Sequence, residues 1–235
     1  MENKTHNKLN TPLAILIGSV IIGVCIILGL TLSGGRGNAM IDPDKIFQGR
    51  AFAKNEMLMG KTSDDVIFLE YSDTECPFCK MFNNDVTLKI KENYKGKIGF
   101  AYRKYPLPMH PQATTESLAA LCAREQGGVE LYERYNQETF ARTKSNNGMA
   151  DGETVRIAKD LKMDMNKFNT CVTASSTKEM LMADIADGVA AGVEGTPYSM
   201  VLIRHGDQYQ ILARINGARD YAYVSRAIDQ AIKYK

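Results

Sequence analysis

The sequence predicts an α/β fold: a mixed β-sheet whose crossover carries an inserted block of helices, preceded by one N-terminal transmembrane helix. Three observations lead to this fold class. Strand and helix patterns follow the order β-α-β, a helical block, then β-β-α, which is typical of a sheet interrupted by a helical subdomain. A cysteine pair lies where the first apolar strand meets a helix, and an uncharged apolar run occupies the N-terminal region.

The N-terminal apolar run is the predicted membrane anchor. No charged residue occurs from Leu9 to Gly35, and residues 13–32 are long enough as a helix to cross the ~30 Å hydrocarbon core. Lys4 and Lys8 precede the run and favour a cytoplasmic N-terminus. The alternative is a cleaved signal peptide, whose apolar region spans only about 7–15 residues. Both interpretations deliver the rest of the chain to an oxidising compartment, where disulfides persist.

The predicted domain organisation follows from this anchor. We expect a single-pass protein of the cell (inner) membrane, with its folded domain on the periplasmic or otherwise extracytoplasmic side. The predicted parts are a cytoplasmic tail (1–12), the transmembrane anchor (13–32), a glycine-rich linker (33–44) and a domain (45–235) with a helical insertion at about 110–192.

The first part of the domain has a β-α-β pattern. Residues 66–71 begin with the run Val-Ile-Phe-Leu, which is typical of a buried strand. Apolar residues recur every four positions within 77–94, so this segment is a predicted helix with one apolar face. A second strand is expected at 98–104. Residues 44–60 are predicted to contain a short helix that docks on the domain.

The second part begins with helical patterns and ends with strands and a helix. Gly127-Gly128 separates the first two predicted helices. Near residue 198 the period changes to that of paired strands, and Asn216-Gly217 is a turn signal. The predicted helices are 116–126, 130–140, 152–161, 164–173, 177–191 and 220–234, and the predicted strands are 198–203 and 209–215.

Composition argues against several functions. The 29 basic and 27 acidic residues leave a net charge of +2, which provides no field for binding nucleic acid. The three histidines are scattered, so we predict no metal site and no cofactor. One of them, His110, lies between prolines and is expected to cap the following helix.

The cysteine pair Cys76 and Cys79 carries the predicted chemistry. It forms the sequence Cys-Pro-Phe-Cys at the start of the predicted 77–94 helix. Unpaired N–H groups and the dipole at a helix start stabilise a thiolate, so the pKa of Cys76 should fall below the ordinary value of ~8.5. A thiolate attacks disulfides and leaves from them, which indicates reversible thiol–disulfide exchange. This interpretation requires that the two sulfurs are not both covered by side chains.

The pattern resembles the thioredoxin superfamily and, within it, the DsbA-like thiol:disulfide oxidoreductases of bacterial envelopes. The resemblance covers roughly residues 45–235 and implies a thioredoxin-like fold with an inserted α-helical subdomain. Four stretches carry it: 68–73 leading into Cys76-Pro77-Phe78-Cys79, Pro106 to Pro111, Leu121 to Gly127, and Gly195-Thr196-Pro197.

The resemblance also implies roles for individual residues. Cys76 would be the nucleophile and Cys79 its buried resolving partner. Thr196 and Pro197 would form a cis peptide bond that faces the dithiol and pairs with the substrate backbone. Glu70 would accept a proton from Cys79, although a buried glutamate satisfied by a backbone N–H or a lysine is the structural alternative.

The sequence departs from the best-known pattern of the family in one place between the cysteines. Phe78 occupies the position where the strongest oxidants carry histidine, whose charge and hydrogen bond favour the reduced form. The pair is therefore expected to be less oxidising than the family archetype. Glu75, directly before the first cysteine, is expected to be a solvated turn residue.

Cys122 and Cys171 form a candidate structural disulfide. Both lie in predicted helices of the insertion, and some DsbA-like proteins have a second bridge there. Two buried unbonded thiols are the alternative. A zinc site that combines them with the C-x-x-C pair is disfavoured, since structural zinc sites usually need two close spacings.

The predicted function is that of a thiol:disulfide oxidoreductase that introduces disulfides into exported proteins through Cys76 and Cys79. The predicted partners are reduced exported proteins, the membrane, and a DsbB-like quinone-linked membrane protein that reoxidises the pair. A disulfide isomerase or reductase is one alternative. A membrane-anchored binding or assembly module with a static disulfide is the other.

Overall fold

The computed structural model describes residues 45–234. The predicted tail, anchor and linker therefore lie outside the described residues. Within 45–234, no helix combines the length and the apolar character needed to cross a membrane.

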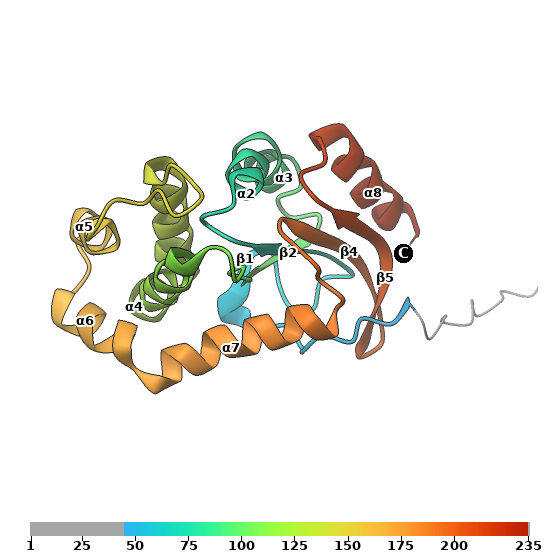
Figure 1. Cartoon of the computed structure of the whole chain (residues 1–235). Coiled ribbons are helices and arrows are strands. Elements are labelled where there is room, and N and C mark those ends of the chain that lie inside the picture. Colours follow the sequence, from blue (N-terminus) through green and yellow to red (C-terminus); the bar gives the residue numbers. More distant parts are fainter. Residues whose placement is uncertain (1–44, 235) are drawn as a thin grey trace, which may run out of the picture. The chain divides into compact units, whose positions relative to one another are not determined.

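A five-stranded mixed sheet forms the centre of the domain (Figure 1). Its strand order is β1-β3-β2-β4-β5. Only the central pair β2 and β3 is parallel, while the remaining neighbours are antiparallel. The strands are β1 (Met57–Met59), β2 (Val66–Ser72), β3 (Gly99–Lys104), β4 (Tyr198–His205) and β5 (Gln208–Asn216). The predicted strands are thus confirmed, and β1 is an additional edge strand.

Alternate residues of β2 point to opposite faces of the sheet and enter two separate cores. Val66 and Phe68 pack on one face with residues of the helices that follow the cysteine pair and of the C-terminal helix. Leu69 and Tyr71 pack on the other face with residues of β4 and of the N-terminal segment. Because β2 is buried along its whole length, its end has little freedom to move, and that end leads into the cysteine pair.

The helix after the cysteine pair is interrupted by a π-helical turn. It consists of α2 (Pro77–Phe82), the π-helical η3 (Asn83–Thr87) and α3 (Leu88–Asn93). Together with α8 (Tyr221–Tyr234), it covers one face of the sheet (Figure 1). The predicted helix is therefore confirmed over nearly its whole length, although one segment has a wider helical turn than expected.

The insertion contains four helices: α4 (Pro111–Arg142), α5 (Glu153–Asp160), α6 (Met165–Thr173) and α7 (Ser175–Ala190). Helix α4 combines the two helices expected at 116–126 and 130–140, and it bends at Gly127 and Gly128. Gly128 has a φ of 66°, a conformation that favours glycine. The double glycine therefore bends the chain where the sequence predicted a break, while Pro111 starts the helix earlier than expected.

The described part of the predicted docking segment, residues 45–60, does not form the expected helix. In its place the structure has a 3-10 turn, η2 (Lys54–Glu56), followed by the edge strand β1. The extended path lets Glu56 reach Arg103 of β3, and it lets Met57 pair with Ala101. Strand pairing and a buried ion pair thus decided the local structure of this segment.

A buried ion-pair cluster joins this segment, β3 and α7. Arg103 has an exposed fraction of 0% and pairs with Glu56 and Asp187. Arg50 pairs with Glu56 and Asp184. Loss of one partner in such a cluster leaves a buried charge uncompensated, so the charges must be buried together.

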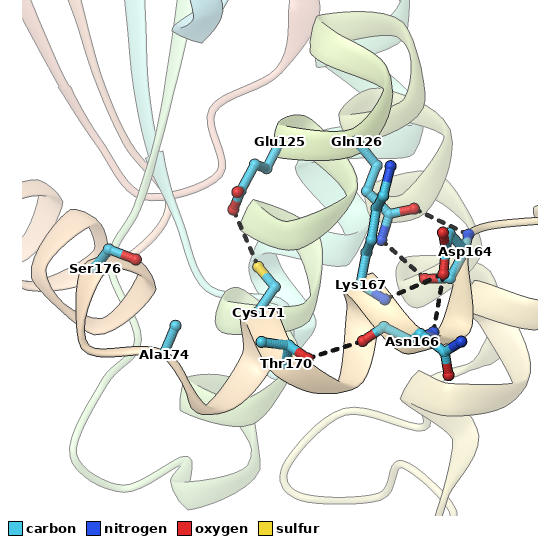
Figure 2. A pocket seen from close by; sticks show the side chains of 9 residues that line it. All are labelled: Glu125, Gln126, Asp164, Asn166, Lys167, Thr170, Cys171, Ala174 and Ser176. Carbon is cyan, nitrogen blue, oxygen red and sulfur yellow. Dashed lines mark hydrogen bonds between the residues drawn. The ribbon is translucent and has the colours of Figure 1, made fainter.

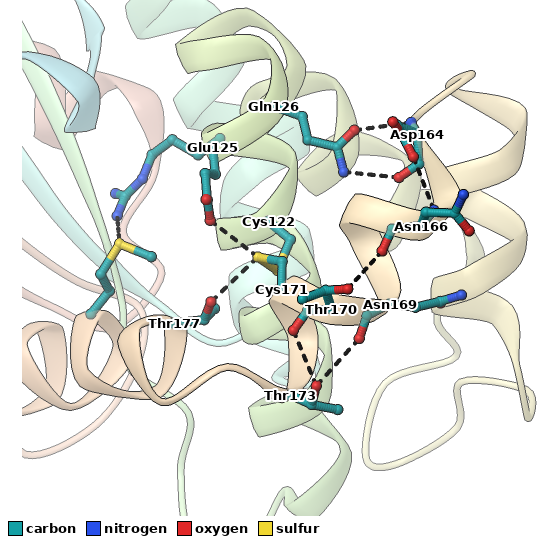
Figure 3. Close-up of a disulfide and its surroundings, with 12 residues drawn as sticks. Cys122, Glu125, Gln126, Asp164, Asn166, Asn169, Thr170, Cys171, Thr173 and Thr177 are labelled. Atoms are coloured by element: carbon teal, nitrogen blue, oxygen red, sulfur yellow. Dashed lines mark hydrogen bonds between the residues drawn. A yellow bond between two sulfur atoms is a disulfide. The ribbon is translucent and has the colours of Figure 1, made fainter.

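Cys122 and Cys171 form a disulfide that joins α4 to α6 (Figure 3). The sulfur of Cys171 lies 3.3 Å from a carboxylate oxygen of Glu125 and 3.3 Å from the hydroxyl oxygen of Thr177. Cys122 is fully buried in the core that the insertion shares with the sheet. The bridge therefore ties the surface helix α6 to a core helix.

Replacement of both bridged cysteines by alanine should destabilise the insertion. The bridge closes a loop with a sequence separation of 49, for which chain entropy predicts a loss of about 4 kcal/mol in the free energy of unfolding. Urea unfolding of Cys122→Ala/Cys171→Ala against wild type measures this loss. The matched control, Cys76→Ser/Cys79→Ser, keeps the bridge. An unchanged urea midpoint in the alanine variant contradicts a stabilising bridge.

Candidate active site

Cys76 occupies the N-cap position of α2, and Pro77 is the first helical residue. Proline is well suited to this position because its missing N–H would have no helical partner there. The N–H of Cys76 donates to the carbonyl of Asp73 at 3.3 Å, and its carbonyl accepts from the N–H of Lys80 at 3.1 Å. The first cysteine is thus held between the turn after β2 and the first turn of the helix.

The environment separates the pKa values of the two thiols. The pKa of Cys76 is lowered to about 6, mainly by a hydrogen bond from the Cys79 thiol, with further hydrogen bonds from the backbone N–H groups of Cys79 and Phe78. Burial raises the pKa of Cys79 well above its ordinary value. At neutral pH the pair therefore holds a thiolate at Cys76 and a thiol at Cys79 when it is reduced.

Both cysteines are more enclosed than we expected from the sequence. Cys79 has an exposed fraction of 0%, as a resolving cysteine should, but Cys76 retains only 4%. Phe140 of α4 packs against the pair. The condition set from the sequence, that the two sulfurs are not both covered by side chains, is therefore not met, because Cys76 is also recessed and Phe140 of the bent helix α4 packs against it. Phe78, between the cysteines, is by contrast exposed.

The Thr196-Pro197 peptide bond is cis and precedes β4. Because β4 pairs with β2, the loop in front of β4 lies beside the end of β2. The carbonyl oxygen of Thr196 is 3.4 Å from the sulfur of Cys76. The structure therefore brings together Cys76, Cys79, Thr196 and Pro197, which are far apart in the sequence.

Glu70 is fully buried on the helix-covered face of β2. Burial raises the pKa of its carboxyl group to about 7. The hydroxyl of Thr87 donates to it at 2.8 Å, whereas the sulfur of Cys79 accepts from the N–H of Asp73 at 3.4 Å. Charges on both Glu70 and Cys79 raise the pKa of Tyr102, so the carboxyl group lies in the same buried region as the second cysteine.

Glu75 is not the solvated turn residue that the sequence predicted, since its exposed fraction is 0%. Its carboxylate accepts from the hydroxyl of Thr143 at 2.6 Å and from the N–H of Gly148 at 3.0 Å. The loop after α4 folds back over the turn and supplies these donors. Burial and the adjacent carboxyl of Glu75 raise the pKa of Glu116 to about 8, so these two buried acids hold a proton between them at neutral pH.

His110 occupies the N-cap position of α4, yet its side chain does not cap the helix. Its Nδ1 lies 2.9 Å from a carboxylate oxygen of Asp73. Sequence reasoning missed this pair. Asp73 directly follows β2 and His110 lies in the loop after β3, and the carboxyl ends of parallel strands meet at one edge of a sheet. That parallel pairing is the signal that could have placed them together.

Comparison with known proteins agrees with this arrangement. The family model described as Thioredoxin matches residues 53–230. The chain belongs to the thioredoxin family. This thioredoxin-family chain is 26% identical over 137 residues to Disulfide bond formation protein D of Bacillus subtilis (strain 168). The match covers 57% of this chain and 57% of that relative, so it spans little more than half of the relative's length.

Solved structures share the fold. DsbA2 from Pseudomonas aeruginosa has a TM-score of 0.62 at 22% identity, covering 76% of this chain and 94% of that one. BdbD from Bacillus subtilis, in its oxidised form, has a TM-score of 0.62 at 19% identity, covering 80% and 99%. The thioredoxin-like fold with an inserted helical region, which the sequence predicted, is thereby confirmed for the described residues.

A separate hollow of about 850 Å³ in this thioredoxin-family domain has Cys171 in its wall (Figure 2). Helices α4 and α6 and the start of α7 supply its lining, which includes Cys171 and Glu125. Its polar side chains are largely engaged with one another, as Gln126 is with the backbone of Asp164. Neither Cys76 nor Cys79 lines it, so the dithiol and this hollow are distinct.

The Glu70→Gln variant should show that the buried carboxyl group lowers the free energy of unfolding of the wild type as the pH rises. Glu70 loses its proton near pH 4.5 when unfolded and near pH 7 when folded, so this group makes the wild type less stable as the pH rises between these values. The variant does not titrate and keeps the size of the side chain. Its stability relative to wild type should therefore increase by about 3 kcal/mol between pH 4.5 and pH 8. Urea unfolding at a series of pH values measures this, and a pH-independent difference contradicts it.

Proposed function

We propose that this protein is an extracytoplasmic thiol:disulfide oxidoreductase that introduces disulfides into exported proteins through Cys76 and Cys79. The observation that carries the proposal is the opposite shift of the two thiol pKa values, to about 6 for Cys76 and far upward for Cys79. A stabilised thiolate favours the reduced form of the pair, and therefore favours the transfer of its disulfide to another protein.

The proposed exchange has two steps. A substrate thiolate attacks the sulfur of Cys76 in the Cys76–Cys79 disulfide; the S–S bond breaks, and Cys79 leaves with the electron pair and takes up a proton. A second substrate thiolate then attacks the substrate sulfur of the mixed disulfide, and Cys76 leaves as a thiolate. The substrate has lost two electrons and gained one disulfide, while the protein's own pair is reduced.

Three other residues have proposed roles in this exchange. The carbonyl of Thr196, 3.4 Å from the sulfur of Cys76, lies where the backbone of an extended substrate segment would meet the cis-Pro197 loop. Glu70, with its pKa raised to about 7, is a buried acid that can exchange a proton near neutral pH. In this proposal it accepts the proton of Cys79 when the pair is reoxidised.

Reoxidation requires an electron acceptor, for which we propose a DsbB-like, quinone-linked membrane partner. The apolar run at residues 13–32 supports a membrane anchor that would keep the domain near such a partner. The name of the Bacillus subtilis relative, Disulfide bond formation protein D, supports the direction of the reaction. The structures named DsbA2 and BdbD share the fold in which this chemistry is proposed.

Oxidative refolding of a reduced, disulfide-containing test protein is the direct test. The oxidised full-length protein, purified in mild detergent, should accelerate the appearance of native disulfides. The Cys76→Ser variant should return the rate to that of the uncatalysed reaction. Its matched control, Cys122→Ala/Cys171→Ala, retains the C-x-x-C pair and should still oxidise the test protein at a temperature at which it is folded.

Two other outcomes would replace the proposal. Rescue of a scrambled test protein without oxidation of a reduced one identifies an isomerase. Inertness in both assays, with a Cys76–Cys79 bridge that resists mild reductant, identifies a binding or assembly module with a static disulfide.

Alkylation of the reduced protein as a function of pH tests the carrying observation itself. The rate at Cys76 should reach half of its maximum near pH 6, and Cys79 should stay unmodified because it is fully buried. A midpoint near pH 8.5, the ordinary value for a cysteine, counts against an oxidase.

A further inference from the structure

The C-x-x-C sequence contains no cation between its cysteines, because Phe78 occupies that position and is exposed. The ammonium group of Lys80, the nearest lysine along the helix, does not pair with the thiolate. It donates to the carbonyl of Thr143 at 2.6 Å. Hydrogen bonds from Cys79 and from backbone N–H groups lower the pKa of Cys76, and any positive charge that adds to them comes from another part of the chain.

Asp73 ties a histidine to the turn that carries the first cysteine. One carboxylate oxygen of Asp73 accepts from the N–H of Glu75 at 2.8 Å, and the other lies 2.9 Å from Nδ1 of His110. The latter oxygen also accepts from the N–H of Leu107 at 2.8 Å. The backbone carbonyl of Asp73 accepts from the N–H of Cys76. The imidazole is therefore attached to the same short turn as the reactive sulfur.

The loop after α4 holds the imidazole from another side. Asn146 hydrogen-bonds to His110 through its side chain, and its backbone N–H donates to the carbonyl of Glu75 at 2.7 Å. His110 is buried, with an exposed fraction of 5%. The ring is therefore fixed between two elements that both bind the residues directly preceding Cys76.

We propose that His110, held as an imidazolium by Asp73 and Asn146, supplies the positive charge that stabilises the thiolate of Cys76. A loop that follows β3 thereby contributes the cation that is absent from the C-x-x-C sequence. This inference rests on the proposed function, and it assigns His110 as a positioning residue that acts on the charge of Cys76.

The titratable groups facing His110 support this assignment. Burial lowers its pKa, but the hydrogen bond and negative charge of Asp73 and the charge of Cys76 raise it, and the net direction is upward from 6.5. The third neighbour, Asn146, is uncharged. Since Cys76 ionises near pH 6, there is a pH range above that value in which thiolate and imidazolium coexist and attract each other.

The His110→Gln variant of the reduced full-length protein tests the charge. A nearby opposite charge shifts a pKa by about one unit or more, so the alkylation midpoint of Cys76 should rise by about one pH unit. That corresponds to about tenfold less thiolate at pH values below both midpoints. The matched control is His205→Gln at the far end of β4, which should leave the midpoint unchanged. An unchanged midpoint in folded His110→Gln overturns the proposal.

A second measurement keeps His110 intact. The coupling between two titrating groups is reciprocal, so each charge shifts the pKa of the other group by the same amount. The pKa of His110 should therefore be higher when Cys76 is a thiolate than when it is oxidised to a disulfide. NMR titration of the histidine ring protons in the reduced and oxidised protein measures this difference. With three histidines in the chain, His6→Gln and His205→Gln assign the signals. Equal pKa values of His110 in the two forms overturn the proposal.

The two proposals fail separately. If the wild type oxidises the test protein while His110→Gln keeps the wild-type alkylation midpoint, the proposed function stands and the role of His110 falls. If the wild type does not oxidise the test protein but the two titrations are coupled, the oxidase function falls and the charge pairing stands.

Discussion

The start of helix α2 is the constraint on which the site depends. Cys76 is the N-cap residue, so its sulfur lies where backbone N–H groups have no helical partner, and those of Phe78 and Cys79 turn toward it. The helix in turn begins a few residues after β2, which is buried along its length. The sheet therefore fixes the turn, the turn fixes the helix start, and the helix start fixes the charge on the sulfur.

Buried polar groups around this turn show that the insertion completes the site. Glu75 is satisfied by Thr143 and Gly148, which lie beyond the end of α4. Lys104, at the end of β3, is fully buried with its ammonium group on Asn136 of α4, and burial lowers its pKa to about 8. Each of these groups would be costly to bury without its partner. The helical insertion thus stabilises the polar residues on which the cysteine turn rests.

Most of the helices and strands could be predicted from the sequence, because apolar runs, apolar periodicity and glycine turns are signals within each segment. The strands at 66–71 and 98–104 were found from apolar runs, and Gly127-Gly128 located the bend within α4. The docking helix predicted at 44–60 failed for a non-local reason. Its residues bind charges and strand edges far away in the sequence, such as Arg103, and these contacts outweigh a weak helical preference.

The candidate site was predicted unevenly for the same reason. The resemblance implied the cis bond before Pro197 and the Cys122–Cys171 bridge, and the structure contains both. The surroundings of Glu75 and His110 were predicted wrongly. Their neighbours in the sequence suggest exposure and helix capping, whereas their actual partners come from the loop after α4 and from the turn after β2.

The sequence by itself determined the reactive pair, since an N-cap cysteine and its partner one turn later depend only on a strand, a proline and a helix that are contiguous in the chain. Only the tertiary structure decided what surrounds that pair: Thr196 comes from the loop before β4 and Phe140 from α4, while His110 from the loop after β3 binds Asp73 of the cysteine turn. The physical reason is that burial and Coulomb interactions act between groups that are close in space. Spacing along the chain does not reveal which distant side chains the sheet and the insertion bring to one sulfur.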